Sequence, residues 1–232
     1  MKNALCIVGT DTEVGKTIVT SALAAYWQRY HHDRSLAIFK PVQSGVGDRE
    51  RYDRCFETQQ TLDSITPLFF STPIAPPLAA DREGKAIDLA RVWNAFCQLQ
   101  NSRDFVLVEG VGGLGSPVTW ELTVADLVRD WRLPVVLVVP VRLGAISQAV
   151  ANVALARQCG LDLRGIVLNC ADRQGENEVA DLAPARLIET LTATPVLGCL
   201  PYLEDTEDGE MLARSAAQLD LERLLGGAIA PR

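Results

Sequence analysis

The segment from Gly9 to Thr17 combines glycine, threonine and lysine in a spacing that could bind phosphate groups. It reads GTDTEVGKT, directly after an apolar run and directly before a helical pattern. In that context, backbone N–H groups of the loop and of the first helical turn surround phosphate oxygens. Lys16 would reach the terminal phosphates, and the Thr17 hydroxyl would bind Mg²⁺. Although five residues rather than four separate Gly9 from Gly15, the segment predicts a nucleotide-binding loop.

An acidic residue that could hold the metal ion ends a second apolar run. The stretch from Asp104 to Gly110 reads DFVLVEG and delivers Glu109 at its carboxyl end. Parallel sheets open their ligand crevice at that end of the strands. The glycines that follow, Gly112 and Gly113, allow the backbone to approach a ligand closely. A metal-linked role for Glu109 is therefore favoured over an ordinary solvated carboxylate.

A second lysine, Lys40, ends a third apolar run and is followed by the residues PVQSG. Most lysines at strand ends are simply solvated. If this strand lies near the first one, however, Lys40 can approach Lys16 and the terminal phosphate. Two ammonium groups there would suit phosphoryl transfer to an anionic acceptor, a reaction in which charge stabilisation carries most of the catalysis.

Apolar runs and helical patterns alternate along the chain and would position these side chains. The predicted strands are Ala4 to Gly9, Leu36 to Lys40, Phe105 to Glu109, Val135 to Val139, Gly165 to Asn169 and Val196 to Leu200. The predicted helices are Thr17 to Tyr30, Asp88 to Gln100, Thr123 to Arg132, Ala145 to Gln158, Pro184 to Leu191 and Met211 to Leu225. This alternation predicts an α/β fold, a doubly wound, mainly parallel sheet with helices on both faces, in one domain over residues 1–232.

The segment from Val42 to Lys85 breaks this rhythm, because it is first rich in charge and then in proline. We expect a long irregular insertion beside the ligand-binding edge of the sheet. An ordered wall of the site and a lid that closes on binding are both compatible with its composition.

Composition narrows the class of partner. The formal net charge is -7 and no basic cluster stands out, so nucleic acid and an anionic membrane surface are not expected partners. No apolar stretch approaches the roughly 20 residues that span a bilayer, and a cytoplasmic location is expected. The six cysteines show no C-x-x-C spacing, which argues against a zinc knuckle or a redox pair.

Three segments together resemble the signature segments of the dethiobiotin synthetases. They are GTDTEVGKT from Gly9, KPVQSG from Lys40 and VEGVGG from Val108, and the resemblance extends to about Tyr202. It implies a P-loop domain, usually a homodimer. It also implies a reaction that closes the ureido ring of dethiobiotin from 7,8-diaminopelargonate, CO2 and MgATP through a carbamyl phosphate.

The resemblance also assigns roles to individual residues. Lys16 and Lys40 would be catalytic, stabilising the carbamate and the transferring phosphoryl group. Mg²⁺ would be bound by Thr17, Glu109 and an aspartate after the Lys40 loop, with Asp48 favoured and Asp53 an alternative. The substrate-binding residues would be Thr12, Ser44, Leu143, Gly144 and Ala145, the last three reaching the substrate carboxylate from the neighbouring subunit. The ATP-binding residues would be Glu13, Val14, Gly15, Lys16, Thr17, Ile18, Asp48, Glu109, Gly110, Gly112, Asn169, Cys170, Pro201, Tyr202 and Leu203. Cys170 stands where family members often have a polar residue, which leaves the base specificity open.

Other classes of P-loop protein fit the sequence less well. Regulatory ATPases of the partitioning type carry a lysine before the paired glycines of the loop, whereas this chain has Asp11. Amidating synthetases of the cobyrinate type need a glutaminase domain, for which we expect no room before Arg232. A binding module without catalysis is disfavoured by the presence of both lysines and of Glu109.

Overall fold

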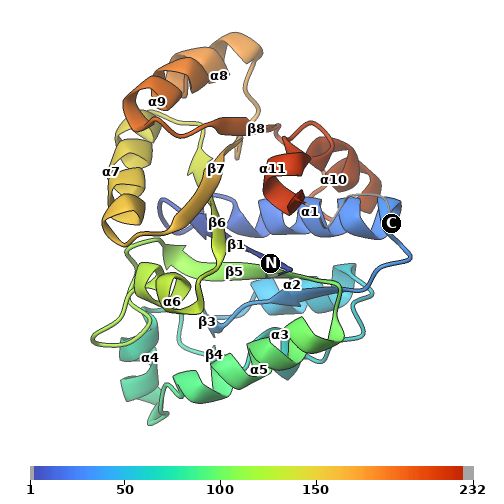
Figure 1. The fold of residues 1–232 in the computed structure, drawn as a ribbon, viewed down its shortest axis with the longest axis vertical. Coiled ribbons are helices and arrows are strands. Elements are labelled where there is room, and N and C mark those ends of the chain that lie inside the picture. The colour runs from blue at the N-terminus through green and yellow to red at the C-terminus, as the bar shows by residue number, and fades with distance from the viewer. Residues whose placement is uncertain (1–2, 227–232) are drawn as a thin grey trace.

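A six-stranded sheet forms the centre of the protein (Figure 1). The computed structural model describes residues 3–226. The strands of the sheet are β1 (Ala4–Gly9), β2 (Leu36–Phe39), β5 (Phe105–Gly113), β6 (Pro134–Pro140), β7 (Asp162–Asn169) and β8 (Val196–Leu200). They lie in the order β2-β5-β1-β6-β7-β8, and all neighbours are parallel, which confirms the predicted fold class. The chain changes direction across the sheet at β1, the position at which open α/β sheets bind ligands.

Helices cover both faces of the sheet, as the pattern predicts. One face packs against α1 (Lys16–Tyr30), α10 (Gly209–Ala216) and α11 (Leu221–Leu225). The other face packs against α5 (Leu89–Ser102), α6 (Val124–Trp131), α7 (Ala145–Gln158) and α9 (Ala185–Thr192). Alternate residues of β1 enter the two cores, Cys6 and Val8 on one side and Leu5 and Ile7 on the other. Because both faces are buried, the strands are apolar throughout rather than alternating.

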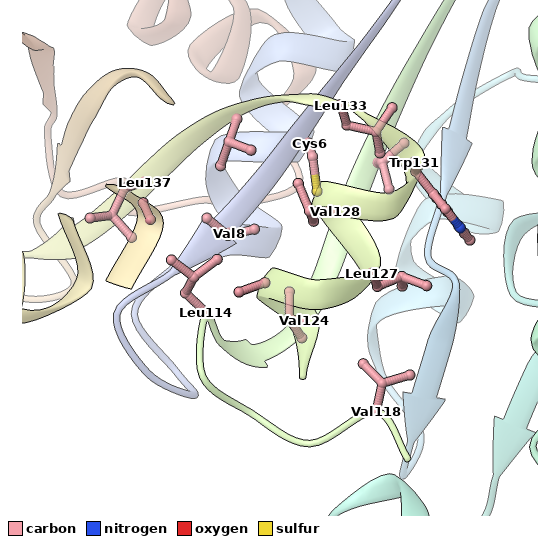
Figure 2. Close-up of a cluster of buried hydrophobic side chains, with 14 of the residues drawn as sticks. Cys6, Val8, Leu114, Val118, Val124, Leu127, Val128, Trp131, Leu133 and Leu137 are labelled. Atoms are coloured by element: carbon pink, nitrogen blue, oxygen red, sulfur yellow. The ribbon is translucent and has the colours of Figure 1, made fainter. Parts of the chain in front are cut away.

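Helix α6 is fixed next to β1 by its cap and its apolar face. The Thr123 hydroxyl accepts from the Asp126 amide, and the Asp126 carboxylate accepts from the Thr123 amide, so the two residues form a capping box. Val124, Val128 and other α6 side chains then join the buried cluster around β1 that Figure 2 shows. One side of strand β1 is thereby packed against α6.

The prediction of an irregular insertion from Val42 to Lys85 is wrong. The segment contains β3 (Val42–Ser44), α2 (Asp48–Cys55), α3 (Leu62–Ile65), β4 (Leu68–Phe70) and α4 (Pro76–Glu83). Strands β3 and β4 form a parallel pair of their own. Each of these strands has three residues, which is too short for a periodicity to show in the sequence.

Two details of the C-terminal part also differ from the prediction. The helix expected from Met211 to Leu225 is divided into α10 and α11, because the Asp220 carboxylate accepts from the Arg223 amide and starts a new helix. A further helix, α8 (Glu176–Leu182), was not predicted; it has no buried residues, and only Val179 and Leu182 pack partly against the core. Within residues 3–226, no helix is both long and apolar enough to cross a membrane.

Candidate active site

The phosphate-binding loop connects β1 to α1 in a conformation that requires glycine at its tip. Gly15 has a φ of 93°, a region that residues with a side chain rarely adopt. A Cβ atom on Gly15 would also lie 2.0 Å from the Asn169 side-chain nitrogen. That amide donates to the Val14 carbonyl at 3.2 Å. The end of β7 therefore holds the loop from one side.

Strand β5 holds the same loop from the other side. It continues beyond the predicted end at Glu109 as far as Gly113, which pairs with Gly9. A Cβ on Gly113 would lie 2.9 Å from the Thr10 carbonyl oxygen, so the close approach of the two backbones depends on glycine. The Leu114 amide adds a hydrogen bond of 2.9 Å to the Gly9 carbonyl. The loop is thus fixed by contacts within the protein itself.

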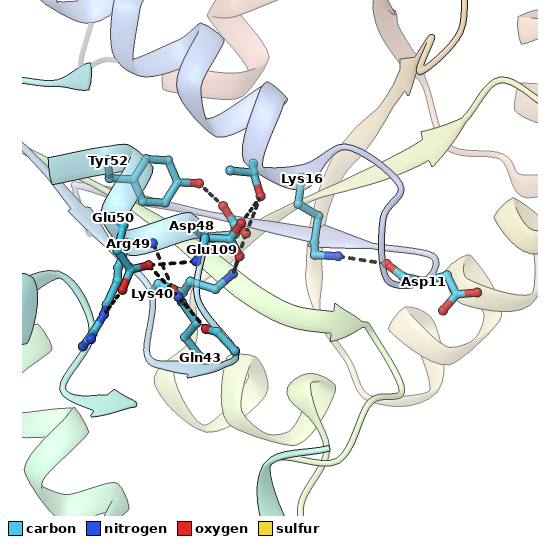
Figure 3. A network of polar contacts seen from close by, with 12 residues as sticks. Asp11, Lys16, Lys40, Gln43, Asp48, Arg49, Glu50, Tyr52 and Glu109 are labelled. Atoms are coloured by element: carbon cyan, nitrogen blue, oxygen red, sulfur yellow. Dashed lines mark hydrogen bonds and ion pairs between the residues drawn. The ribbon is translucent and has the colours of Figure 1, made fainter. Parts of the chain in front are cut away.

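Lys40, Glu109 and Asp48, which were predicted to act together, do meet at the carboxyl ends of the strands (Figure 3). The Glu109 carboxylate is completely buried. It accepts hydrogen bonds from Lys40 Nζ at 2.6 Å, from Thr17 Oγ1 at 3.1 Å and from the Tyr52 hydroxyl. Asp48 accepts from the same two groups, Lys40 Nζ at 2.6 Å and Thr17 Oγ1 at 3.0 Å. Asp53, the alternative to Asp48, lies on the exposed side of α2 and has no part in this cluster.

Both lysines are buried, but their surroundings shift their pKa values in opposite directions. Burial lowers the pKa of Lys16 to about 8, although the negative charge of Glu109 opposes the shift. Burial also disfavours the charged form of Lys40, but Glu109 and Asp48 outweigh it and raise the pKa of Lys40 above its ordinary value. Lys16 Nζ donates to the Asp11 carbonyl at 2.8 Å, within the loop. Lys40 is therefore held by two carboxylates, whereas Lys16 is held within the loop.

The donor set at this point fits Mg²⁺. Two carboxylates, Glu109 and Asp48, converge on one hydroxyl, that of Thr17. Magnesium in nucleotide sites uses one or two carboxylates and keeps water and phosphate oxygens as its other ligands. The described residues include no group of three or more His, Cys, Asp or Glu side chains arranged as a metal centre, so a metal site made of protein ligands alone is not seen there.

Helix α2 places Asp48 through hydrogen bonds that the sequence does not reveal. Gln43, at the centre of β3, accepts from the Arg49 amide at 2.9 Å and donates to Glu50 at 3.1 Å. The Glu50 carboxylate also accepts from the Gly47 amide at 2.8 Å, which fixes the start of the helix. The hydrogen bonds that fix the turn before α2 therefore also position Asp48.

The middle and the last turn of α2 are attached to the segment that follows β8. The Arg51 guanidinium donates to the Thr206 hydroxyl at 3.2 Å and to the Thr206 carbonyl. Arg54 pairs with Glu207 on the surface beside it. Helix α2 thus connects the carboxylate cluster to the opposite wall of the site.

A cleft of about 580 Å³ lies along this edge of the sheet. The predicted residues that line it are Thr12, Glu13, Gly15, Lys16, Thr17, Ile18, Lys40, Ser44, Asp48, Glu109, Gly112, Asn169, Cys170, Pro201, Tyr202 and Leu203. The lining residues that sequence reasoning missed are Gln43, Val111, Ala171, Glu204 and Thr206. All but Thr206 stand next to predicted positions, but nothing in their types distinguishes them from ordinary loop residues.

Five predicted residues do not line the cleft. Val14 is fully buried beneath the loop, and Gly110 is buried between β1 and α6. Leu143, Gly144 and Ala145 lie at the start of α7, with Leu143 90% exposed on the surface. Those three residues were predicted to act on a neighbouring subunit, and that prediction remains untested within one chain.

A phosphate loop, two buried lysines and a carboxylate pair at the switch point of a parallel sheet define a P-loop nucleotide-binding protein. A family model described as an AAA domain matches residues 3–210. The solved ParA family ATPase from Chlorobium tepidum has a similar fold, with a TM-score of 0.59 at 15% identity over 98% of both chains.

Two relatives are much more similar in sequence, and both are named ATP-dependent dethiobiotin synthetase BioD. The relative from Gloeothece citriformis is 57% identical over 96% of this chain and 98% of its own, and the relative from Crocosphaera subtropica is 56% identical over 95% and 98%. The chain belongs to the dethiobiotin synthetase family.

Proposed function

We propose that the protein is an ATP-dependent dethiobiotin synthetase, a ligase of biotin biosynthesis. It carboxylates 7,8-diaminopelargonate with CO2 and closes the ureido ring, giving dethiobiotin, ADP and phosphate. The observation that supports this most directly is the placement of Lys16 and Lys40 around one cleft, both of them buried, with Lys40 bonded to Glu109 and Lys16 bonded within the phosphate loop. A carbamate and a triphosphate are both anions, and two fixed ammonium groups lower the cost of bringing them together.

The proposed reaction has three steps. One substrate amine adds to CO2 and loses a proton, which gives a carbamate. A carbamate oxygen then attacks the terminal phosphorus of ATP, and ADP leaves. The second amine finally attacks the carbamyl carbon, the ring closes, and phosphate and a proton are released. Lys16 and Lys40 stabilise the negative charge in the second step.

Mg²⁺ would be held by Thr17, Asp48 and Glu109, where it would supply positive charge to the phosphate oxygens. In the structure the same carboxylates orient the Lys40 ammonium, with both distances at 2.6 Å. Glu109 and Asp48 thus keep Lys40 charged and fixed in place, and a charged Lys40 is what an anionic acceptor requires.

The substrate lies on the side of the cleft formed by Thr12 and Ser44. Both residues line the cleft, and the Ser44 hydroxyl oxygen is buried without a hydrogen-bond partner among residues 3–226. Buried hydroxyls normally have a partner, so a polar group of the substrate fits this position. ATP extends from the loop toward Asn169 and the wall formed by Pro201, Tyr202 and Leu203.

A second copy of the chain completes the substrate site. Leu143 is 90% exposed and Val150, farther along α7, is 38% exposed. Gly144 leads into a helix of 14 residues, whose N-terminal amides suit a carboxylate. Sedimentation of the purified protein is expected to give the mass of a homodimer, and a monomer at assay concentration would remove this part of the proposal.

The decisive experiment measures phosphate release by the purified protein with MgATP and bicarbonate, with and without 7,8-diaminopelargonate. We expect release to depend strictly on the diamine, and mass spectrometry of the organic product to give dethiobiotin. ATP hydrolysis at the same rate without the diamine would instead favour a regulatory ATPase.

A further inference from the structure

Two cysteines from different strands meet beside the nucleotide end of the cleft. Cys170 directly follows β7 and Cys199 lies in β8, and their sulfur atoms are 3.6 Å apart. The backbones are held together there, because the Cys170 amide donates to the Leu200 carbonyl at 2.9 Å. The sulfurs of a disulfide are about 2.05 Å apart, so bond formation requires the two sulfurs to approach by roughly 1.5 Å. Both thiols are free in the structure.

The positions of the two thiols connect this pair to the cleft. Cys170 itself lines the cleft, and it follows Asn169, whose amide holds the Val14 carbonyl of the phosphate loop. Cys199 precedes Pro201 by two residues, and Pro201 also lines the cleft, at the end of the strand that pairs with β7. A bond between the sulfurs would shift the ends of these two neighbouring strands, and both ends line the cleft.

We propose that Cys170 and Cys199 are a redox modification site, whose reversible disulfide weakens nucleotide binding. The effect on binding rests on the proposed function, because that function places ATP against these two strand ends. The formation of the bond does not depend on it.

The chemistry needs a low-molecular-weight disulfide as oxidant. Cys170 lines the cleft although most of its surface is buried, and the half-buried Cys199 lies beside it, so a small reagent is needed to reach the pair. Its hydrogen bond with Cys199 holds the pKa of Cys170 below the ordinary value, although burial opposes the shift, and a thiolate is the attacking species. The Cys170 thiolate attacks the reagent, a mixed disulfide forms and one small thiolate leaves. Cys199, whose pKa the bond with Cys170 and burial hold above the ordinary value, then gives up its proton, and its sulfur displaces the second small thiolate, which takes a proton. Two protein thiols are thereby oxidised and one small disulfide is reduced to two thiols.

The bond can be detected directly. The protein is incubated with hydroxyethyl disulfide, the remaining thiols are alkylated, and the chain is digested with trypsin without reduction. Cleavage after lysine and arginine leaves Cys170 in peptide 165–173 and Cys199 in peptide 187–214, each with a single cysteine. We expect these two peptides to be found linked, and their separation after dithiothreitol. Failure to find the linked pair while other thiols react would overturn the proposal.

The functional consequence is measured as the dissociation constant for MgATP before and after oxidation. We expect binding to weaken at least about tenfold, equivalent to about 1.4 kcal/mol, and to recover on reduction. Cys199→Ser, or Cys199→Ala if the serine variant does not fold, should be insensitive to the oxidant. Cys97→Ser, at a half-buried cysteine on α5, should respond like the unmodified protein.

The outcomes separate the two proposals. A linked peptide with unchanged MgATP affinity would overturn the regulatory effect. If the reduced protein does not bind MgATP at all, the proposed function fails, whereas the peptide evidence for the disulfide stands independently.

Discussion

Tyr52 offers the sharpest test of how the carboxylate cluster is held together. Its ring is completely buried in α2 and its hydroxyl donates to Glu109 Oε2. Burial and the charge of Glu109 raise the pKa of Tyr52 well above the ordinary value, so the hydroxyl keeps its proton and remains a donor. Tyr52→Phe removes that one donor from a buried, charged oxygen and leaves the ring in place, so little packing is lost.

The expected loss follows from the type of bond. A hydrogen bond to a charged group contributes about 1.5 to 3 kcal/mol. For a chain of this size, each kcal/mol lowers the melting temperature by about 2 to 4 °C, so Tyr52→Phe should lower it by about 3 to 12 °C. Unfolding in urea, followed by circular dichroism, gives the free energy directly. Affinity for MgATP should also fall, because Glu109 loses one of the groups that orient it.

Tyr30→Phe is the matched control, since the Tyr30 ring is 49% exposed at the end of α1. Its effect should lie within about 0.5 kcal/mol, as for most surface changes. If Tyr52→Phe unfolds with the same free energy as the control, the Tyr52 hydroxyl does not stabilise Glu109, and its hydrogen bond does not hold the carboxylate cluster together.

Three further substitutions test other parts of the site. Lys40→Ala should retain MgATP binding in a calorimetric titration and lose dethiobiotin formation. Removing one partner of a buried ion pair also costs about 3 to 5 kcal/mol of stability. Turnover at the wild-type rate would refute the catalytic role of Lys40. Asp48→Asn should raise the Mg²⁺ concentration needed for half-maximal activity, whereas Asp53→Asn, on the exposed side of the same helix, should leave it unchanged; equal effects would contradict the assignment of Asp48. Gly15→Ala, at a φ of 93° and with an atom only 2.0 Å from the added carbon, should weaken nucleotide binding at least about tenfold. Gly209→Ala, which meets no atom within 4 Å, should bind like the unmodified protein, and similar affinities for both variants would show that the loop tolerates a side chain.

The parts of the site carried by the central sheet could be predicted from the sequence. Gly9, Lys40 and Glu109 each stand at the end of an apolar run, and parallel strands bring such ends to the same side of the sheet whatever their order in it. The order of the strands in the sheet could not be predicted. Strand β5 lies between β1 and β2, so Lys40 contacts Glu109 rather than the phosphate loop directly.

The parts carried by local hydrogen bonds could not be predicted in the same way. Helix α2 is strongly polar, and Tyr52 is its only buried residue, so it shows no apolar face. Its start depends on Gln43 and Glu50, which are side-chain partners rather than a pattern. The pairing of Cys170 with Cys199 depends on the register of two strands, which a scan for closely spaced cysteines does not find.

Helix α2 contacts two separate parts of the cleft wall. Its first residue, Asp48, belongs to the carboxylate cluster, while Arg51, one turn later, is bonded to Thr206, which also lines the cleft. Because both contacts come from one short helix, any movement of α2 as a unit changes the position of Asp48 and of the Thr206 contact together.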